Sequence, residues 1–227
     1  MSDNLTREDG SRICFFDLLD ETQFEVLSQA SLAVNYRAGE LIFRQGTPVS
    51  HMFYLKKGLV KISKEVRNDR VIILDVFVSD SFIGLPSVFG EGPYEYSAIA
   101  VEDSEVVMTG VADLKDVISS NGLFAVRLLE QMSNEGFRML TKFTNHLQKQ
   151  LPGRVAEMLL FFSKEIFGSD VFDLPLSRRE LADFTGTTKE SMIRTLAEFR
   201  HDRIIKLDGK KVEIISHDII NALSRLG

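Results

Sequence analysis

Residues 176–200 read LSRRELADFTGTTKESMIRTLAEFR, and this stretch decides the C-terminal fold. Apolar residues recur in it at helical spacing: Leu181, Phe184, Met192, Leu196 and Phe199. Gly186 stands between the two groups, where a tight turn needs a positive φ that glycine adopts without steric cost. Ala182 is small enough for two crossing helices to approach, and Thr187 and Thr188 are both good N-cap residues. The pattern predicts two short helices joined by a tight turn, the helix-turn-helix layout.

The polar residues of the second predicted helix suit the chemistry of base recognition. Arg194 can donate two parallel hydrogen bonds to guanine, Glu190 can accept one from a cytosine amino group, and Lys189 can reach a guanine or a phosphate. In helix-turn-helix proteins the second helix enters the DNA major groove by its N-terminal end. The predicted DNA-binding residues are Arg178, Thr188, Lys189, Glu190, Ser191, Arg194, Lys210 and Lys211.

An ordinary solvent-exposed helix is the alternative interpretation of the same residues. Glu190 and Arg194 have the i,i+4 spacing of an ion pair, and Thr187 with Glu190 matches a capping box. The preceding Ala-Gly turn favours recognition, because it presents the helix to a partner.

A basic hairpin is predicted directly after this motif. Residues 204–215, IIKLDGKKVEII, alternate apolar and polar around Asp208-Gly209, a strong two-residue hairpin signal. Lys210 and Lys211 at its tip resemble the wing of a winged helix, placed to meet phosphates.

Composition bounds the class of protein. A chain of 227 residues suits two domains, and with 44% hydrophobic residues it can bury a sizeable core. No apolar run approaches the roughly 18 residues of a membrane span, and the acidic N-terminus lacks a signal core. The single cysteine, Cys14, excludes an internal disulfide framework and fits a reducing cytoplasm, where we expect the protein.

The net charge of −6 is unusual for a DNA-binding chain. Of 27 Lys+Arg and 33 Asp+Glu, 12 of each lie in residues 151–227, so the acidity belongs to residues 1–150. DNA binding must therefore rest on the local placement of charge.

The first half of the chain predicts a roll of short strands. Residues 15–31 indicate short amphipathic helices, and another short helix begins at Asp113. Between them lie the β-like runs LAVNYR, ELIFRQG, MFYLKKGLVKISK, RVIILDVFV, SAIAV and EVVMTGV. Several short strands at regular spacing favour an antiparallel sandwich or barrel.

A long helix is predicted over about 122–150, ended by Pro152-Gly153. It carries more apolar residues than one sheet face needs, so we expect one face against the roll and one against a second copy of the chain. A wholly intramolecular core helix is the alternative. The residues assigned to the dimer interface are Leu129, Met132, Gly136, Met139 and Phe143.

The predicted fold class is α+β: an N-terminal antiparallel, jelly-roll-like β-roll with flanking helices, a long dimerisation helix and a C-terminal winged helix-turn-helix. The expected domains are 1–120, 121–151 and 152–227. This order of elements resembles the CRP/FNR family of bacterial transcription regulators over nearly the whole chain. The motifs that carry the resemblance are YRAGELIFRQG, FYLKKGLVKI, FIGLPSVFGEG and the helix-turn-helix.

The resemblance implies a homodimer on a two-fold symmetric operator in double-stranded DNA, with an effector domain that controls the recognition helices. An activator would also contact RNA polymerase, although no motif identifies that surface. By position, the effector pocket would involve Gly84, Leu85, Ser87, Tyr96, Ser97 and Met139.

The effector pocket departs from the cyclic-nucleotide-binding pattern. Family members hold the phosphate with a Gly-Glu pair that opens a short helix and with a later Arg before Ser or Thr. Here Gly84 is followed by Leu85, and Ser97 follows Tyr96, so the Glu and the Arg are both missing. The Thr-Ser that meets the purine becomes Met139-Leu140. These losses argue against cyclic AMP, and the effector, if there is one, is an unknown small molecule.

Cofactor chemistry finds little support. An iron–sulfur branch needs four cysteine ligands, and one cysteine exists. The four histidines are scattered, which argues against a haem sensor and against a metal site. No nucleophile–base pair or Gly-rich phosphate loop occurs at useful spacing, so an enzyme is the weakest alternative. The other is an effector-binding or protein-interaction module with little DNA specificity.

Overall fold

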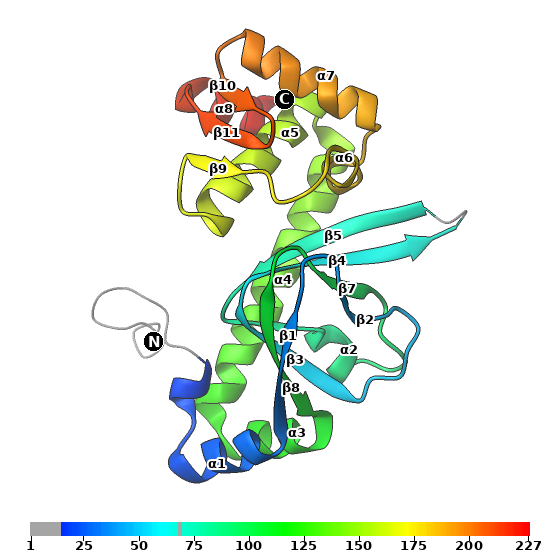
Figure 1. Cartoon of the computed structure of the whole chain (residues 1–227), viewed down its shortest axis with the longest axis vertical. Coiled ribbons are helices and arrows are strands. Elements are labelled where there is room, and N and C mark those ends of the chain that lie inside the picture. Colours follow the sequence, from blue (N-terminus) through cyan, green and yellow to red (C-terminus); the bar gives the residue numbers. More distant parts are fainter. Residues whose placement is uncertain (1–14, 68–69) are drawn as a thin grey trace. The chain divides into compact units, whose positions relative to one another are not determined.

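The computed structural model describes residues 15–67 and 70–227, so Cys14 lies outside the described residues. The chain divides into two compact units (Figure 1). The first comprises residues up to Ile62 together with Val76–Arg138, and the second comprises Ser63–Asp75 together with Met139–Gly227. The segment Ser63–Asp75, between the two parts of the first unit, thus belongs by its contacts to the C-terminal unit.

Two four-stranded sheets form the roll (Figure 1). One has the order β1-β8-β3-β6, with β1 Ser31–Tyr36, β3 His51–Lys57, β6 Ser81–Ile83 and β8 Ser104–Gly110, all paired antiparallel. The other has the order β2-β7-β4-β5, with β2 Leu41–Phe43, β4 Leu59–Val66, β5 Arg70–Val78 and β7 Ser97–Ala100. The predicted runs are confirmed as strands, and Gly58, at φ 104°, separates β3 from β4. In the roll, the short strand β6 has no counterpart among the predicted runs.

Helices flank the roll at its N-terminal and C-terminal borders. The short 3-10 helix η2 Phe15–Leu18 and α1 Glu21–Gln29 precede it, α2 Leu85–Phe89 interrupts it, and α3 Val111–Ser120 follows. Their buried side chains form one cluster with the strands, including Phe15, Met52, Phe82, Leu114 and Phe124. The ring of Phe15 meets that of Phe82 edge-on at 4.7 Å, an arrangement that aromatic quadrupoles favour.

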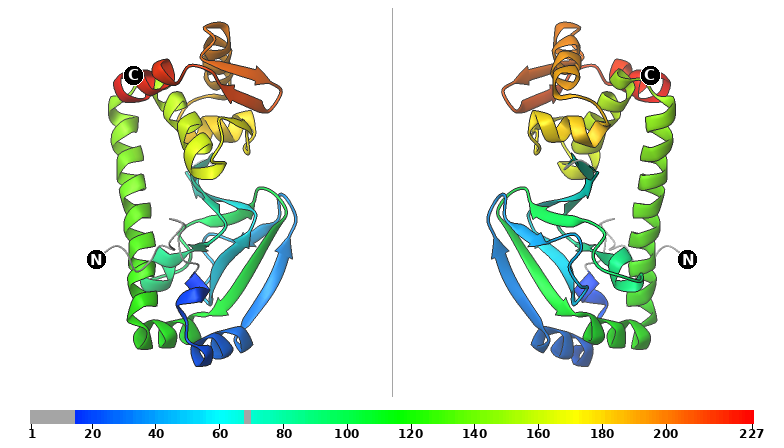
Figure 2. Two further views of the ribbon diagram at one scale, coloured as in Figure 1. Left: turned by 90° about the vertical axis from the view of Figure 1, so that its left-hand side faces the viewer. Right: turned by 90° about the vertical axis from the view of Figure 1, so that its right-hand side faces the viewer.

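The long helix is α4, Gly122–Gln148, which Figure 2 shows as a single unbroken helix. Its first turns bury Phe124, Arg127 and Leu128. The next helix, α5 Leu151–Phe161, starts at once, with Pro152 in its first turn. The prediction that Pro152-Gly153 ends the long helix is therefore corrected: α4 ends before Pro152, and Pro152 lies in the first turn of α5. Proline is tolerated there because the N–H groups of a first turn have no partner within the helix.

The C-terminal unit is a winged helix. After α5 and the π-helical segment η3 Phe162–Ile166 come β9 Val171–Asp173, α6 Arg178–Thr185, α7 Lys189–His201, β10 Ile205–Asp208, β11 Lys211–Ile214 and α8 His217–Leu226. The wing sheet has three strands in the order β10-β11-β9, and β9 was not predicted. The helical apolar residues read from the sequence, Leu181, Phe184, Met192, Leu196 and Phe199, are all buried, which confirms the period.

Candidate nucleic-acid interface

The first helix of the motif, α6, is closed at both ends. Ser177 Oγ accepts a hydrogen bond from the Glu180 amide at 3.3 Å, and Glu180 Oε2 accepts one from the Ser177 amide at 2.8 Å. This capping box satisfies two amides that the helix itself leaves unpaired. At the other end Gly186 adopts φ 66°, as the sequence predicts, and its amide returns to the last turn of α6. Both ends of α6, and hence the direction of the following turn, are fixed by local chemistry.

The second helix, α7, starts at Thr188, whose Oγ1 accepts a hydrogen bond from the Ser191 amide at 3.2 Å. The alternative capping box of Thr187 with Glu190 is not formed. Met192 and Leu196 face inward, while Lys189, Glu190 and Arg194 are exposed. The alternative i,i+4 ion pair is absent too, because neither Glu190 nor Arg194 pairs with any residue that the structure describes. Their polar groups are therefore available to a partner.

Ile193 is a surface residue that the sequence prediction passed over. Its side chain is 46% exposed and lies in sequence between Glu190 and Arg194 on the outward side of α7. Because Met192 beside it is fully buried, the helical period could have placed Ile193 outside. An exposed apolar side chain on a helix that enters the DNA major groove can contact a thymine methyl.

The wing lies beside the motif, and Figure 2 shows the hairpin β10–β11 next to α7. Asp208 pairs with Lys211, so the turn consists of Gly209 and Lys210, one residue later than the predicted Asp208-Gly209. Lys210 and Lys211 are both exposed.

Arg178 connects α6 to this turn. Its Nη2 donates to the Gly209 carbonyl at 2.6 Å, and burial lowers the pKa of the guanidinium. Arg178, which the sequence analysis assigned to DNA binding, therefore holds the tip of the wing. The other N–H donors of its guanidinium do not take part in this hydrogen bond.

The turn of the motif rests on the end of α4. The His146 ring lies against Gly186: a Cβ built there would come within 2.7 Å of His146 Cδ2 and Nε2. His146 Nδ1 donates to the Lys142 carbonyl at 2.8 Å. Arg154 Nε donates to the Thr185 carbonyl at 2.9 Å, and its Nη1 donates to the Lys149 carbonyl at 2.8 Å. The contacts of His146 with Gly186 and of Arg154 with Thr185 are not visible in the sequence, since each joins residues more than 30 positions apart.

Lys142 adds a second support. Its Nζ donates to the Leu74 carbonyl of β5 at 2.9 Å and lies 3.1 Å from the centroid of the Phe184 ring. A partly buried ammonium over an aromatic face is attracted by the ring quadrupole. Nearby on α6, burial raises the pKa of Asp183, while the charges of Arg179 and Arg70 lower it. The β4–β5 arm and α6 thus interact within the C-terminal unit.

The residues predicted for the effector pocket are mostly packed into the first unit. Leu85 is fully buried in the main hydrophobic cluster, and Gly84 opens α2 at φ 94° against the rings of Tyr94 and Phe43. Ser97 Oγ accepts from the Gln45 amide at 2.9 Å. Met139, on α4, is 43% exposed and belongs to the second unit. Of the six residues, only Ser87 lines a pocket of about 410 Å³ in this unit.

Tyr96 stands where cyclic-nucleotide-binding members carry an arginine. It is only 7% exposed, and its hydroxyl is hydrogen-bonded to the backbone of Gly84. Burial, the Glu135 carboxylate and Tyr94 all raise its pKa, so the hydroxyl is neutral. A neutral phenol beside a carboxylate offers no charge to a phosphate.

The long helix exposes an apolar seam. Its members recur at alternating steps of four and three residues: Val126, Leu129, Ser133, Gly136, Leu140, Phe143 and Leu147. Leu129, Leu140, Phe143 and Leu147 are each more than 60% exposed. Of the predicted interface residues, Leu129, Gly136 and Phe143 lie in the seam and Met139 lies beside it. Met132 is instead partly buried against the main cluster of the first unit, because its position faces the roll.

Neither a metal-binding cluster nor a membrane-spanning helix occurs in residues 15–67 and 70–227. Over those ranges, no cluster of three His, Cys, Asp or Glu side chains is arranged to hold a metal ion. No helix within them has the length and apolarity to cross a membrane.

Comparison with known proteins agrees with this architecture. Residues 33–121 match the cyclic nucleotide-binding domain, and residues 153–223 match the Crp-like helix-turn-helix domain. A CRP-like cAMP-activated global transcriptional regulator of Mycobacterium tuberculosis is 24% identical over 208 residues, covering 90% of this chain and 93% of the relative.

Solved structures share the fold. FixK2 from Bradyrhizobium japonicum superposes with a TM-score of 0.78 at 21% identity, covering 85% of this chain and 96% of FixK2. The c-di-GMP responsive global regulator CLP of Xanthomonas campestris gives a TM-score of 0.73 at 24% identity, covering 87% and 100%. With both domains matched in the order that the fold displays, the chain belongs to the CRP/FNR family of transcription regulators and is not an enzyme.

Proposed function

We propose that this regulator binds a palindromic operator as a homodimer, reads its bases with α7 and responds to something other than cyclic AMP. Residues 1–120 would form the effector domain, 121–151 the dimerisation helix and 152–227 the DNA-binding domain. Because its proposed targets are DNA and RNA polymerase, we expect it in the cytoplasm.

The observation that carries the proposal is the exposed edge of α7. This edge carries four exposed side chains of different chemistry, in chain order a cation, a carboxylate, an apolar group and a guanidinium: Lys189, Glu190, Ile193 and Arg194. Glu190 and Arg194 are uncommitted to each other, so each can bond a base edge without first breaking an ion pair. An arginine bidentate to guanine and a carboxylate accepting from cytosine together specify a base pair step. Ser191 and Thr188 at the start of the helix and Lys210 and Lys211 in the wing would meet phosphates.

The seam of α4 supports the homodimer. Steps of four and three residues keep apolar side chains on one line of a helix, which is the pattern that coiled-coil partners bury. Gly136 at its middle would let two helices approach closely. Two copies related by a two-fold axis present two α7 helices, and a palindromic operator matches that symmetry.

The rejection of cyclic AMP rests on three positions. Leu85 is buried where the ribose-binding Glu would stand, Tyr96 replaces the Arg that would neutralise the phosphate, and Glu135 adds a negative charge beside Tyr96. The M. tuberculosis relative is named as cAMP-activated, so it is a suitable positive control. We expect cyclic AMP to raise the melting temperature of that relative and to leave this protein unchanged. Saturable heat on titration of micromolar cyclic AMP into this protein would overturn the assignment.

The experiment for DNA recognition is selection of binding sites from random DNA, followed by fluorescence anisotropy on the enriched site. We expect an inverted repeat to be enriched. Arg194→Ala should cost about 1–3 kcal/mol on that site and relax the preference at one base pair of each half. The matched control is Arg225→Ala, which removes the same exposed charge from α8. No enriched sequence, or an equal loss in both variants, would favour an interaction module without DNA specificity.

The experiment for dimerisation is sedimentation equilibrium. Leu140→Glu places a charge in the seam, whereas Leu226→Glu makes the same change at a position that is 88% exposed outside it. We expect the first variant to be monomeric and the second to remain dimeric. A monomeric parent chain, or a dimer that tolerates Leu140→Glu, would refute the seam as the interface.

A further inference from the structure

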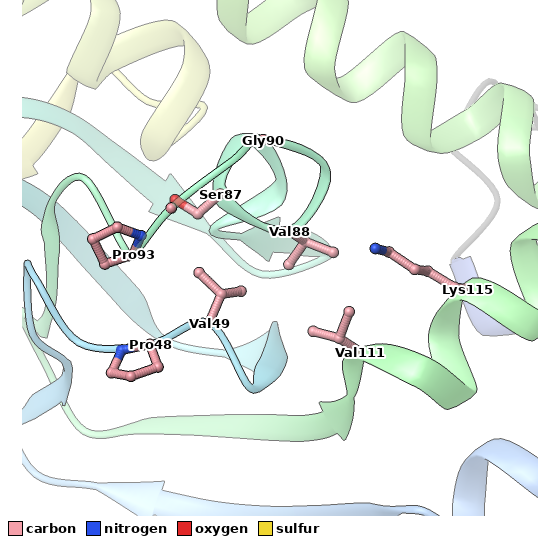
Figure 3. A pocket seen from close by; sticks show the side chains of 9 residues that line it. Pro48, Val49, Ser87, Val88, Gly90, Pro93, Val111 and Lys115 are labelled. Atoms are coloured by element: carbon pink, nitrogen blue, oxygen red, sulfur yellow. The ribbon is translucent and has the colours of Figure 1, made fainter.

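A pocket in the first unit lies outside the predicted effector residues, apart from Ser87. Three segments line it: Pro48 and Val49 before β3, the stretch from Ser87 in α2 to Pro93, and Val111 with Lys115 in α3 (Figure 3). Its volume is about 410 Å³, within the range of small-molecule sites.

The polar groups of this pocket are few, and they are not used by the fold. Ser87 is 8% exposed, and its buried Oγ has no hydrogen-bond partner within residues 15–67 and 70–227. A buried hydroxyl without a partner is costly and calls for a ligand or water. Lys115 is exposed and pairs with no carboxylate among the residues that the structure describes; its Nζ lies 5.9 Å from the Phe89 ring centroid.

Figure 3 shows how these groups are arranged around the apolar walls. Ser87 and Lys115 lie at opposite ends, and the amine of Lys115 points toward the valines. Val49, Val88 and Val111 lie between the two ends. The walls therefore suit an apolar chain, and only its two ends would meet polar groups.

We propose that this pocket binds an elongated aliphatic carboxylate whose far end carries a hydroxyl or carbonyl oxygen. The carboxylate would pair with Lys115, the methylene chain would pack on the three valines, and the far oxygen would accept from Ser87 Oγ. A single ammonium and apolar walls match a monoanion, whereas a phosphate would need several convergent donors. The site lies wholly within the first unit, and its test contains no DNA, so it stands or falls apart from the proposed function.

The experiment is isothermal titration of the full chain with octanoate, with octanamide as the uncharged probe of the same length. We expect one octanoate per chain, and octanamide to bind at least about tenfold more weakly, because it lacks the charge that Lys115 attracts. Lys115→Met keeps the apolar stem and should remove that difference. Lys206→Met, an exposed lysine of the wing, is the matched control and should leave it unchanged.

The second arm tests the Ser87 end with 8-hydroxyoctanoate. We expect the wild type to prefer it to octanoate by about fivefold, the value of one added hydrogen bond, and Ser87→Ala to abolish that preference. Absence of saturable octanoate binding, or equal octanoate affinity in Lys115→Met and Lys206→Met, would overturn the site. A preference that survives in Ser87→Ala would overturn the proposed direction of the ligand.

Discussion

Replacing Gly186 with alanine tests whether the recognition motif depends on its support by α4. Gly186 has φ 66°, and an L-residue in that conformation costs about 1–2 kcal/mol. The new Cβ would also lie 2.7 Å from His146 Cδ2 and Nε2, so the imidazole must move. Moving it sacrifices the hydrogen bond from His146 Nδ1 to the Lys142 carbonyl, worth about 0.5–1.5 kcal/mol. Gly186→Ala should therefore destabilise the protein by about 1.5–3.5 kcal/mol.

The wing supplies a matched control for the backbone effect. Gly209 has φ 56°, but a Cβ built on it meets nothing within 4 Å. Gly209→Ala should therefore cost only the backbone part, about 1–2 kcal/mol. The difference between the two variants isolates the contact with His146.

The assay is urea unfolding followed by circular dichroism at 222 nm, with a double-mutant cycle through His146→Ala. With the imidazole removed, Gly186→Ala should cost no more than Gly209→Ala, which gives a coupling energy of about 0.5–1.5 kcal/mol. Equal costs for Gly186→Ala and Gly209→Ala, or a coupling of zero, would refute the claim that α4 supports the turn.

Three further perturbations follow from particular contacts. Lys142→Met should destabilise the protein by about 1–3 kcal/mol in the same urea assay, because it removes a hydrogen bond to the Leu74 carbonyl and a cation–π contact with Phe184. The control Lys206→Met breaks only an exposed ion pair and should cost less than about 1 kcal/mol. Lys211→Ala should weaken binding to all DNA sequences alike and lower the slope of log affinity against log salt by about 1; a changed base preference would contradict the proposed contact of Lys211 with phosphate. Burial raises the pKa of Tyr96 in the folded protein above the value of 10.0 in the unfolded chain. The neutral phenol therefore contributes fully to stability below about pH 10, and this contribution is lost as the pH rises through the pKa of the folded protein. Absorbance at 295 nm should show this tyrosinate forming only with alkaline unfolding, and ionisation of all four tyrosines near pH 10 in a folded chain would show that Tyr96 is not buried as described.

The sequence was most informative where the signal is local. The helical period of residues 176–200 placed five apolar side chains correctly in the core, and the positive φ of Gly186 followed from its place between two helices. The strands of residues 32–111 were predicted from another local signal, short β-like runs at regular spacing. The three-residue strands β6 and β9 were missed, whereas β2, of the same length, lies within the predicted run ELIFRQG. The hairpin turn was displaced by one residue, since the ladder extends to the pair Asp208–Lys211 and leaves Gly209 and Lys210 as the loop.

Chain patterns alone therefore determined the fold class, the order of the elements and the exposed edge of α7, because periodicity and capping depend on residues three or four positions apart. Tertiary structure decided the rest. It placed Arg178 on the wing tip, turned Met132 toward the roll, brought His146 against Gly186 and Lys142 against α6, and buried Tyr96. Each of these contacts joins residues from elements far apart in the chain, and such contacts leave no local period in the sequence.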